Sequence, residues 1–283
     1  MTLHGWRISA AGRPRPFAPA GEDLDTATLA LPPGLYTTLR TFGGGRKALG
    51  LCAHLRRLYR PLPALSVRPQ VPLERLPGLL DALTAPLRPR EWRLRLVLHL
   101  EDGTLTVLAQ PLVPPPEWVY REGVAVITVP LVRRRPELKR TAFIAESRAE
   151  RQAVRAQGAY EGLLVRRGRI WEGLTSNFFY VTQAGVGTAG YGVLRGVTRR
   201  AVIFLVRRLG LPLTYAALPV AQLSALEEAF LTSSSRGVVP IVRVDGRPVG
   251  SGLPGPVTRR LQQAYAAYVA RRARPLKGWR CGP

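Results

Sequence analysis

Lysine is the residue whose scarcity in this chain points to chemistry. The sequence has 42 lysine and arginine residues, yet lysine occurs only at Lys47, Lys139 and Lys277. A lysine amine can give up its proton and attack a carbonyl carbon, whereas an arginine guanidinium stays protonated. Lys139 lies in the middle of the chain, at the end of a loop between a predicted strand and a predicted helix. It is our candidate for any step that needs a primary amine, although most lysines are simply solvated.

Other residues that could assist such an amine occur in short segments on both sides of it. Glu172 precedes a Gly-Leu-Thr-Ser-Asn run and could pair with a positively charged group. Gly196, Val197 and Thr198 open a predicted helix, whose first N–H groups favour an anion. The segments that we take together have these residue ranges: 54–58, 138–141, 172–179, 194–199, and 230–235 with the Val-Pro pair at 239–240.

Each of these residues also has an ordinary structural interpretation. Glu172 could be a turn glutamate at a strand end, and the Gly-Val-Thr run could be a plain helix cap. The serines at 233–235 could form only a polar loop, and Arg57 could be a solvated arginine on its helix. The order and spacing of the segments together favour a shared site over these separate explanations.

In that order and spacing the chain resembles the class IV, or fold type IV, pyridoxal-phosphate enzymes. The family includes branched-chain aminotransferases, D-amino-acid aminotransferases and 4-amino-4-deoxychorismate lyase, and the resemblance extends from about Gly34 to the C-terminal helix. It implies a mixed α/β (α+β) fold of two domains with the cofactor in the cleft between them. It also implies a homodimer in which the partner completes each pocket.

The resemblance assigns roles to the individual residues. Lys139 would bind the aldehyde of pyridoxal 5′-phosphate and move a proton at the substrate Cα, and Glu172 would pair with the ring nitrogen. The phosphate would be bound by the residues that match the family's phosphate site, and these are Arg57, Val197, Thr198 and Ser234. We expect no metal ion in such a site.

The substrate carboxylate needs a cation as well. Tyr36, Thr38 and Arg40 share one face of a predicted strand, and Arg95 lies on another strand with an alternating pattern. We take these four as candidate substrate-binding residues. The chain departs from many relatives at Ile144, where they have a tyrosine that contacts the cofactor, and this puts a standard branched-chain enzyme in doubt.

Three functional hypotheses remain open from the sequence. The first is transfer of an amino group between a small amino acid and a 2-oxo acid. The second is the lyase reaction, a β-elimination that gives 4-aminobenzoate and pyruvate. The run at 36–40 resembles the lyase more than it resembles the branched-chain enzymes. The third is an arginine-rich nucleic-acid binder or a cofactor-free relative, suggested by the net charge of +24. We favour it least, because arginine is spread along the whole chain and not gathered into one patch.

The pattern of elements is mixed. We predict strands at 34–42, 92–100, 104–112, 124–129, 160–166, 169–172, 177–181, 229–232 and 239–244, and helices at 51–62, 146–157, 197–209 and 256–272. The prolines at 114–116 suggest a boundary between domains 1–116 and 117–283. Two distant cysteines make no disulfide framework, and no apolar run suits a signal or a membrane span, so we expect a cytoplasmic protein.

Overall fold

The structure is a computed structural model that describes residues 2–10 and 13–282, and the chain divides into two compact units. The first unit contains the described residues up to Val113, then Leu138–Ala145, and then the chain from Val269 onward. The second unit contains Pro114–Glu137 and Glu146–Tyr268. The predicted domains 1–116 and 117–283 are continuous stretches, whereas both units combine separated stretches, and the Lys139 segment belongs to the first.

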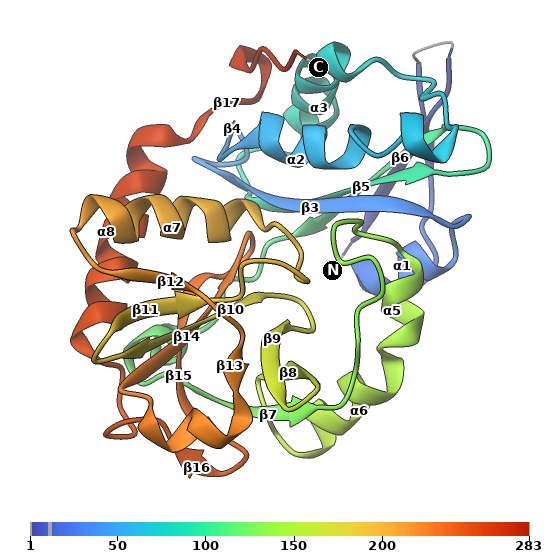
Figure 1. Cartoon of the computed structure of the whole chain (residues 1–283). Helices are drawn as coiled ribbons and strands as arrows, with labels where there is room; N and C mark the ends of the chain where they lie inside the picture. The colour runs from blue at the N-terminus through green and yellow to red at the C-terminus, as the bar shows by residue number, and fades with distance from the viewer. Residues whose placement is uncertain (1, 11–12, 283) are drawn as a thin grey trace. The chain divides into compact units, whose positions relative to one another are not determined.

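The first unit is built on an antiparallel sheet of seven strands (Figure 1). Its order is β17-β4-β3-β5-β6-β1-β2. The strands are β1 (His4–Ile8), β2 (Pro14–Phe17), β3 (Gly34–Phe42), β4 (Lys47–Ala48), β5 (Trp92–His99), β6 (Leu105–Pro111) and β17 (Arg274–Pro275). The helices of this unit are α1 (Leu24–Leu29), α2 (Leu51–Tyr59), α3 (Leu76–Thr84) and all but the last residue of α5 (Ala142–Glu146), with 3-10 turns at Pro63–Leu65, Leu73–Arg75, Ala85–Leu87 and Leu276–Gly278.

Both faces of this sheet are covered. Alternation along β3 sends Leu35 and Leu39 to the face that packs against α2, and Leu55 of α2 belongs to the same core cluster. On the other face Tyr36 packs with Ile144 in a separate small cluster. The residues of β3 are therefore held from both sides, which gives its side chains fixed positions.

The C-terminal tail returns to the first unit and is held there by strand pairing, a buried side chain and a disulfide. Strand β17 pairs with β4, and Leu276 is fully buried in the core of this unit. Cys281 forms a disulfide with Cys52 on α2, with 5.1 Å between the two Cα atoms. The cysteine count predicts no disulfide framework, yet these two residues are joined, because the tail runs back alongside α2.

The second unit is built on a mixed sheet of ten strands. Its order is β12-β11-β10-β14-β15-β7-β8-β9-β13, with β16 beside β15. The strands are β7 (Val124–Val129), β8 (Glu161–Arg166), β9 (Arg169–Gly173), β10 (Asn177–Thr182), β11 (Gly185–Thr188), β12 (Leu213–Tyr215), β13 (Leu218–Pro219), β14 (Glu228–Ser233), β15 (Gly237–Val244) and β16 (Arg247–Pro248). The helices are α4 (Glu117–Arg121), α6 (Arg148–Ala156), α7 (Val197–Arg208) and α8 (Pro256–Arg272), with a 3-10 turn at Val220–Ala225; the last residues of α8 enter the first unit.

Most predicted elements are confirmed, and one short helix was not predicted. The predicted strand at 34–42 and the predicted helix at 256–272 have the observed bounds. The helix predicted over 146–157 is α6 (Arg148–Ala156), and the short helix α5 (Ala142–Glu146) before it was not predicted. Ser147 separates the two helices in a non-helical conformation, and its hydroxyl accepts a hydrogen bond from Arg151. Within the described residues no helix is long and apolar enough to cross a membrane.

Candidate active site

The backbone around Lys139 is pinned to the start of β3. Strand β4 covers only the last two residues of one edge of β3, Thr41 and Phe42. The same edge of β3 is therefore available near Gly34. The Lys139 segment takes that edge. The Tyr36 N–H donates to the Lys139 carbonyl at 2.8 Å, and the Thr141 N–H donates to the Gly34 carbonyl at 2.8 Å. Main-chain hydrogen bonds thus fix the position of the Lys139 backbone.

The side chain of Lys139 lies against one of the predicted substrate residues. Its Nζ is 4.7 Å from the centre of the Tyr36 ring, and the Arg95 guanidinium carbon is 4.8 Å from the centre of the same ring. Arg95 Nε also donates to Thr38 Oγ1 at 3.1 Å. The first unit therefore brings Lys139, Tyr36, Thr38 and Arg95 together, as a cation–aromatic group.

The two arginines predicted to bind a substrate carboxylate both have acidic partners. Arg40 pairs with Glu91 and stacks over Phe42. Arg95 is buried, with 4% of its surface exposed, so its charge needs compensation within the protein. Its guanidinium donates to four oxygens, which are Leu24 O at 2.9 Å, Asp25 Oδ1 at 2.6 Å, Thr28 Oγ1 at 3.0 Å and Thr38 Oγ1 at 3.1 Å. A substrate role for either arginine stays a prediction, and each would have to share its guanidinium with these partners.

Arg57 lies on the opposite side of β3 from the Tyr36 ring. Its Nη2 donates to Thr37 Oγ1 at 2.8 Å, and the same hydroxyl is 2.9 Å from Nδ1 of the buried His54. Since side chains alternate along a strand, Thr37 and Tyr36 point to different faces. His54 and Arg57 therefore both contact the Thr37 hydroxyl, on the face of β3 away from the Tyr36 ring.

In the second unit Glu172 is buried, and its carboxylate accepts hydrogen bonds on both oxygens. Arg133 Nε donates to Oε1 at 2.8 Å, and both side chains are at most 5% exposed. Asn177 Nδ2 donates to Oε2 at 3.2 Å and the Leu194 N–H donates to Oε2 at 3.0 Å. A buried ionised carboxylate requires such donors. The structure therefore provides a fixed, charged acceptor at the end of β9.

Asn177 connects this carboxylate to the start of α7. Its Nδ2 also donates to the Leu194 carbonyl at 2.8 Å, two residues before Gly196. A Cβ atom at Gly196 would lie 2.2 Å from Asn177 Oδ1, so only glycine fits at this approach. Glycine at position 196 therefore lets the start of α7 lie against the Asn177 side chain, which in turn contacts Glu172.

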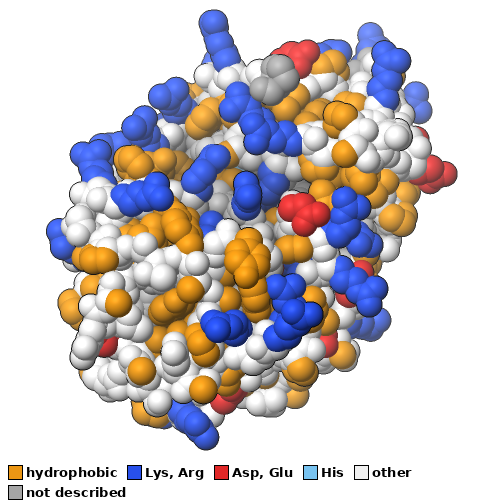
Figure 2. All heavy atoms as spheres, in the orientation of Figure 1, with side chains coloured by type: hydrophobic (Ala, Val, Ile, Leu, Met, Phe, Trp, Pro, Cys, Tyr) orange, Lys and Arg blue, Asp and Glu red, His pale blue; other side chains and the backbone are white. Residues whose placement is uncertain are grey.

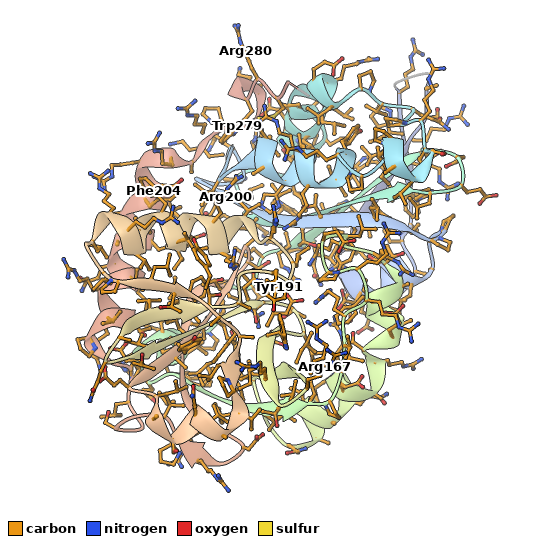
Figure 3. The ribbon with its side chains drawn as sticks, viewed as in Figure 1. Arg167, Tyr191, Arg200, Phe204, Trp279 and Arg280 are labelled. Carbon is orange, nitrogen blue, oxygen red and sulfur yellow. A yellow bond between two sulfur atoms is a disulfide. The ribbon has the colours of Figure 1, made fainter. Side chains whose placement is uncertain are left out.

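The N-terminus of α7 can receive an anion. Its N-cap is Gly196, no side chain among the described residues caps it, and its first turn has no acidic residue. Val197 and Thr198 are the first two helical residues, and Thr198 is buried. Free N–H groups at the start of a twelve-residue helix attract an anion. Arg200 and Phe204 lie further along, on the exposed side of the helix (Figure 3).

Ser234 lies in the connection between β14 and β15. The last pair of that ladder is Ser233 opposite Gly237, so 234–236 forms the turn. The structure thus places Glu172, Val197, Thr198 and Ser234 in the second unit, and Lys139, Arg57, Tyr36, Thr38, Arg40 and Arg95 in the first.

Sequence reasoning missed two partners of Glu172. Asn177 is part of a segment that we selected, but its type gave no reason to link it to Glu172. Arg133 begins a run of three arginines in a chain rich in arginine, and this run hides it. The useful signal for Arg133 would be its place between a predicted strand and Lys139, where a buried cation needs an acidic partner.

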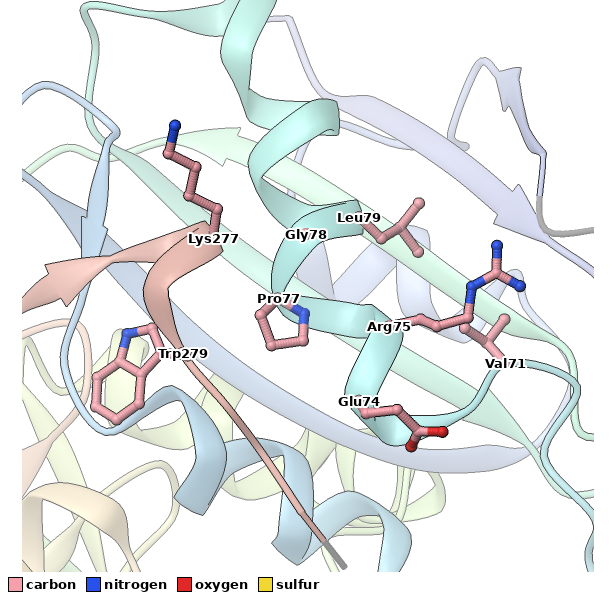
Figure 4. A pocket seen from close by; sticks show the side chains of 8 residues that line it. All are labelled: Val71, Glu74, Arg75, Pro77, Gly78, Leu79, Lys277 and Trp279. Carbon is pink, nitrogen blue, oxygen red and sulfur yellow. The ribbon is translucent and has the colours of Figure 1, made fainter.

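Two hollows can be placed within the units. One of about 460 Å³ lies in the first unit beside α3 and the C-terminal tail, with Trp279 and Lys277 in its lining, and none of the predicted site residues lines it (Figure 4). The other, in the second unit, is lined by Arg133, Glu172 and Trp171 among others. The second hollow thus coincides with the buried carboxylate of the candidate site.

The comparisons with known proteins agree with this geometry. A family model described as amino-transferase class IV matches residues 34–244. A D-alanine aminotransferase of Bacillus licheniformis is 28% identical over 245 residues, which is 82% of this chain and 86% of that protein. A probable branched-chain-amino-acid aminotransferase of Thermotoga maritima is 28% identical over 252 residues, covering 87% of this chain and 90% of that protein.

Solved structures show the same fold. A T.th. branched-chain amino acid aminotransferase with pyridoxamine 5′-phosphate has a TM-score of 0.81 at 23% identity, over 98% of this chain and 97% of that chain. A putative branched-chain amino acid aminotransferase of Thermotoga maritima has a TM-score of 0.77 at 26% identity, over 95% and 96%. These matches favour the aminotransferase over the lyase and over the nucleic-acid binder. The chain is an enzyme and belongs to the class IV aminotransferases.

Proposed function

We propose that this aminotransferase uses pyridoxal 5′-phosphate bound to Lys139 to exchange an amino group between a small amino acid and a 2-oxo acid. The observation that carries the proposal is the linked arrangement in the second unit. There Asn177 joins the Glu172 carboxylate to the segment that leads into the uncapped N-terminus of α7. A fixed acceptor and an anion site at the two ends of one network suit a group that has a protonated ring nitrogen and a phosphate.

The residues present fit this cofactor. Glu172 would accept a hydrogen bond from the protonated ring nitrogen, and its ion pair with Arg133 supplies a compensating charge in the buried site. The N–H groups of Val197 and Thr198, with the Ser234 hydroxyl and the Arg57 guanidinium, would bind the phosphate. Lys139 would bind the aldehyde carbon, and after its release it would move a proton between the substrate Cα and the cofactor. The bound cofactor supplies an electron sink and carries the amino group between the two substrates.

The proposed substrate class follows the names of the relatives. We propose a small α-amino acid as donor, because relatives are named as D-alanine and branched-chain enzymes. Tyr36 and Thr38 would line the substrate side of Lys139, with Arg40 or Arg95 near the carboxylate. A homodimer and a cytoplasmic location complete the proposal, without a nucleic-acid partner.

Reductive trapping tests the central point. The protein is mixed with pyridoxal 5′-phosphate, the carbon–nitrogen double bond is reduced with borohydride, and the modified lysine is located by mass spectrometry. We expect the cofactor on Lys139 and a loss of the cofactor's absorbance in Lys139→Ala. Since lysine occurs at only three positions, Lys47→Ala and Lys277→Ala are matched controls and should keep the label on Lys139.

The outcome separates the hypotheses. The label on Lys47 or Lys277 alone, or equal labelling of the Lys139→Ala variant, would overturn the proposal. With cofactor bound, exchange of an amino group between an amino acid and an oxo acid supports it, whereas release of 4-aminobenzoate without exchange would favour the lyase. A protein that takes up no cofactor and binds DNA with a steep salt dependence would contradict it.

A further inference from the structure

The turn that carries Ser234 is fixed at its two ends by one arginine. Arg236 is the last residue of the turn, and its side chain folds back so that Nε donates to Ser233 Oγ at 3.1 Å. Its own carbonyl accepts a hydrogen bond from the Tyr120 hydroxyl at 2.9 Å. Both residues that flank 234–235 are therefore tethered, and the rest of the turn has little freedom.

The other end of Arg236 reaches a buried acid. Nη2 lies 2.9 Å from Glu161 Oε2, and the exposed fractions of the two side chains are 20% and 4%. The same nitrogen donates to Thr175 Oγ1 at 2.6 Å, and the guanidinium stacks over the Tyr160 ring at 5.4 Å. Because a guanidinium is flat and has five N–H groups, it can join these groups in one geometry.

The acid also fixes the turn that follows Glu172. Glu161 Oε2 accepts hydrogen bonds from the hydroxyls of Thr175 and Ser176. A Cβ atom at Gly173 would lie 2.3 Å from Ser176 Oγ and 3.3 Å from Glu161 Cγ, so this contact leaves room only for glycine. The next residue, Asn177, is the one that bonds to Glu172 and Leu194. One chain of contacts thus connects the Ser234 turn, the turn after Glu172 and the start of α7.

We infer that Arg236 is a positioning residue, which holds the Ser234 turn for the cofactor phosphate by tying it to Glu161 and Thr175. The inference rests on the proposed function, since the phosphate role of Ser234 belongs to that proposal. Arg236 itself need not touch the cofactor. Its guanidinium is committed to Ser233, Thr175 and Glu161, and its effect on the phosphate passes through the backbone of the turn.

Comparing pyridoxal 5′-phosphate with pyridoxal tests this role. The two compounds share the ring and the aldehyde, and only the first has a phosphate. Dissociation constants are measured for both, by absorbance and tryptophan fluorescence, on cofactor-free protein. In Arg236→Lys the positive charge beside Glu161 is kept but the planar fork is lost. We expect affinity for pyridoxal 5′-phosphate to fall by about 10-fold, with pyridoxal affinity unchanged within about 2-fold.

A second comparison asks whether Arg236 acts through Ser234. Ser234→Ala should lower the affinity for pyridoxal 5′-phosphate selectively, and the double variant Ser234→Ala with Arg236→Lys should lose little more, because both changes remove the same contact. Arg243→Gln is the matched control, since Arg243 is an exposed arginine of β15, the strand that follows the turn, and it should leave both affinities unchanged.

Arg236→Gln with Glu161→Gln removes both charges together, so that no buried carboxylate is left alone. It should show the same phosphate-selective loss as Arg236→Lys.

Equal losses for both compounds in Arg236→Lys would show a merely structural role and overturn the inference. Additive losses in the Ser234→Ala double variant would also overturn it, because Arg236 would then act elsewhere. In both cases a wild-type protein that binds pyridoxal 5′-phosphate at Lys139 leaves the proposed function standing. A wild-type protein that binds neither compound contradicts the proposed function and the inference with it.

Discussion

The carboxylate of Glu172 is held from several directions, and this limits where a further partner can approach it. Oε2 accepts from Asn177 and from the Leu194 N–H, whereas Oε1 accepts from Arg133. A carboxylate has about four acceptor positions. These three bonds therefore leave one acceptor position, on the oxygen that Arg133 contacts. A ring N–H placed there would share Oε1 with a guanidinium, so Arg133 sets both the orientation and the charge of the acceptor.

Removing Arg133 should destabilise the fold and not only the chemistry. Arg133→Gln leaves the Glu172 charge buried without its cation, and breaking a buried pair in this way costs about 3–5 kcal/mol. The double variant Arg133→Gln with Glu172→Gln has no uncompensated charge, and we expect it to lose less stability than Arg133→Gln alone. The free energy of unfolding from urea denaturation measures both effects.

The neighbouring Arg134 is exposed and gives a matched control. Arg134→Gln should keep the wild-type free energy of unfolding to within about 0.5 kcal/mol, as surface changes usually do. Equal stability of Arg133→Gln and Arg134→Gln would contradict a stabilising role for the buried ion pair.

Among the elements, the β5–β6 hairpin contains a buried histidine that should make folding depend on pH. His99 is 3% exposed, and its Nε2 lies 3.0 Å from Thr106 Oγ1 on the facing strand. Burial lowers the pKa of His99 below 6.5, although Asp102 acts in the other direction. Below pH 6.5 the unfolded chain therefore takes up a proton that the folded hairpin does not accept until a lower pH. Stability should fall as the pH is lowered through this window.

The measurement is the thermal midpoint between pH 7.5 and pH 5. Wild-type protein should lose stability below about pH 6.5, and His99→Gln, which cannot take up a proton, should show a smaller loss. Parallel pH curves for the two proteins would contradict this explanation.

The elements show which parts of the fold a sequence can reveal. Periodicity identified β3, α8 and the β5–β6 hairpin because their apolar residues recur over many positions. It missed β12 and β13, which have only three and two residues. It also missed α5, which has only five residues.

The same contrast applies to the candidate site. Glu172 and the Gly-Val-Thr start of α7 are adjacent to recognisable turns and helix starts, so local sequence indicated them. The links between them are long-range contacts. Arg133 lies 39 residues from Glu172 and Arg236 lies 75 residues from Glu161 along the chain. No local pattern pairs such residues, and among so many arginines their types are uninformative.

At the scale of the whole molecule, most of the excess arginine is spread over the surface, and a few arginines form buried ion pairs. The 18 acidic residues could neutralise at most 18 of the 42 basic ones, and the remaining 24 equal the net charge. On the face in view, blue side chains are scattered among apolar and uncharged ones (Figure 2). The arginines with assigned structural roles are buried beside acids, such as Arg95 with Asp25 and Arg133 with Glu172. Charge alone therefore indicates solubility and long-range attraction of anions, and not the fold.

The disulfide is the covalent feature that acts on the whole chain. Cys52 and Cys281 are separated by 229 residues, and the loop that they close includes the entire second unit. Cross-linking restricts the unfolded chain most when the loop is long, so we expect the bond to contribute about 2–5 kcal/mol to the free energy of unfolding.

Urea denaturation of Cys52→Ser with Cys281→Ser, and of wild-type protein with and without a thiol reductant, measures this contribution. The double variant and the reduced wild type should lose the same stability, and the reductant should not affect the double variant. Thiol titration of the unfolded wild type should find reactive thiols only after reduction. Thiols that react without reductant would show an open pair, and the tail would then depend on Leu276 and the β17–β4 pairing for its attachment.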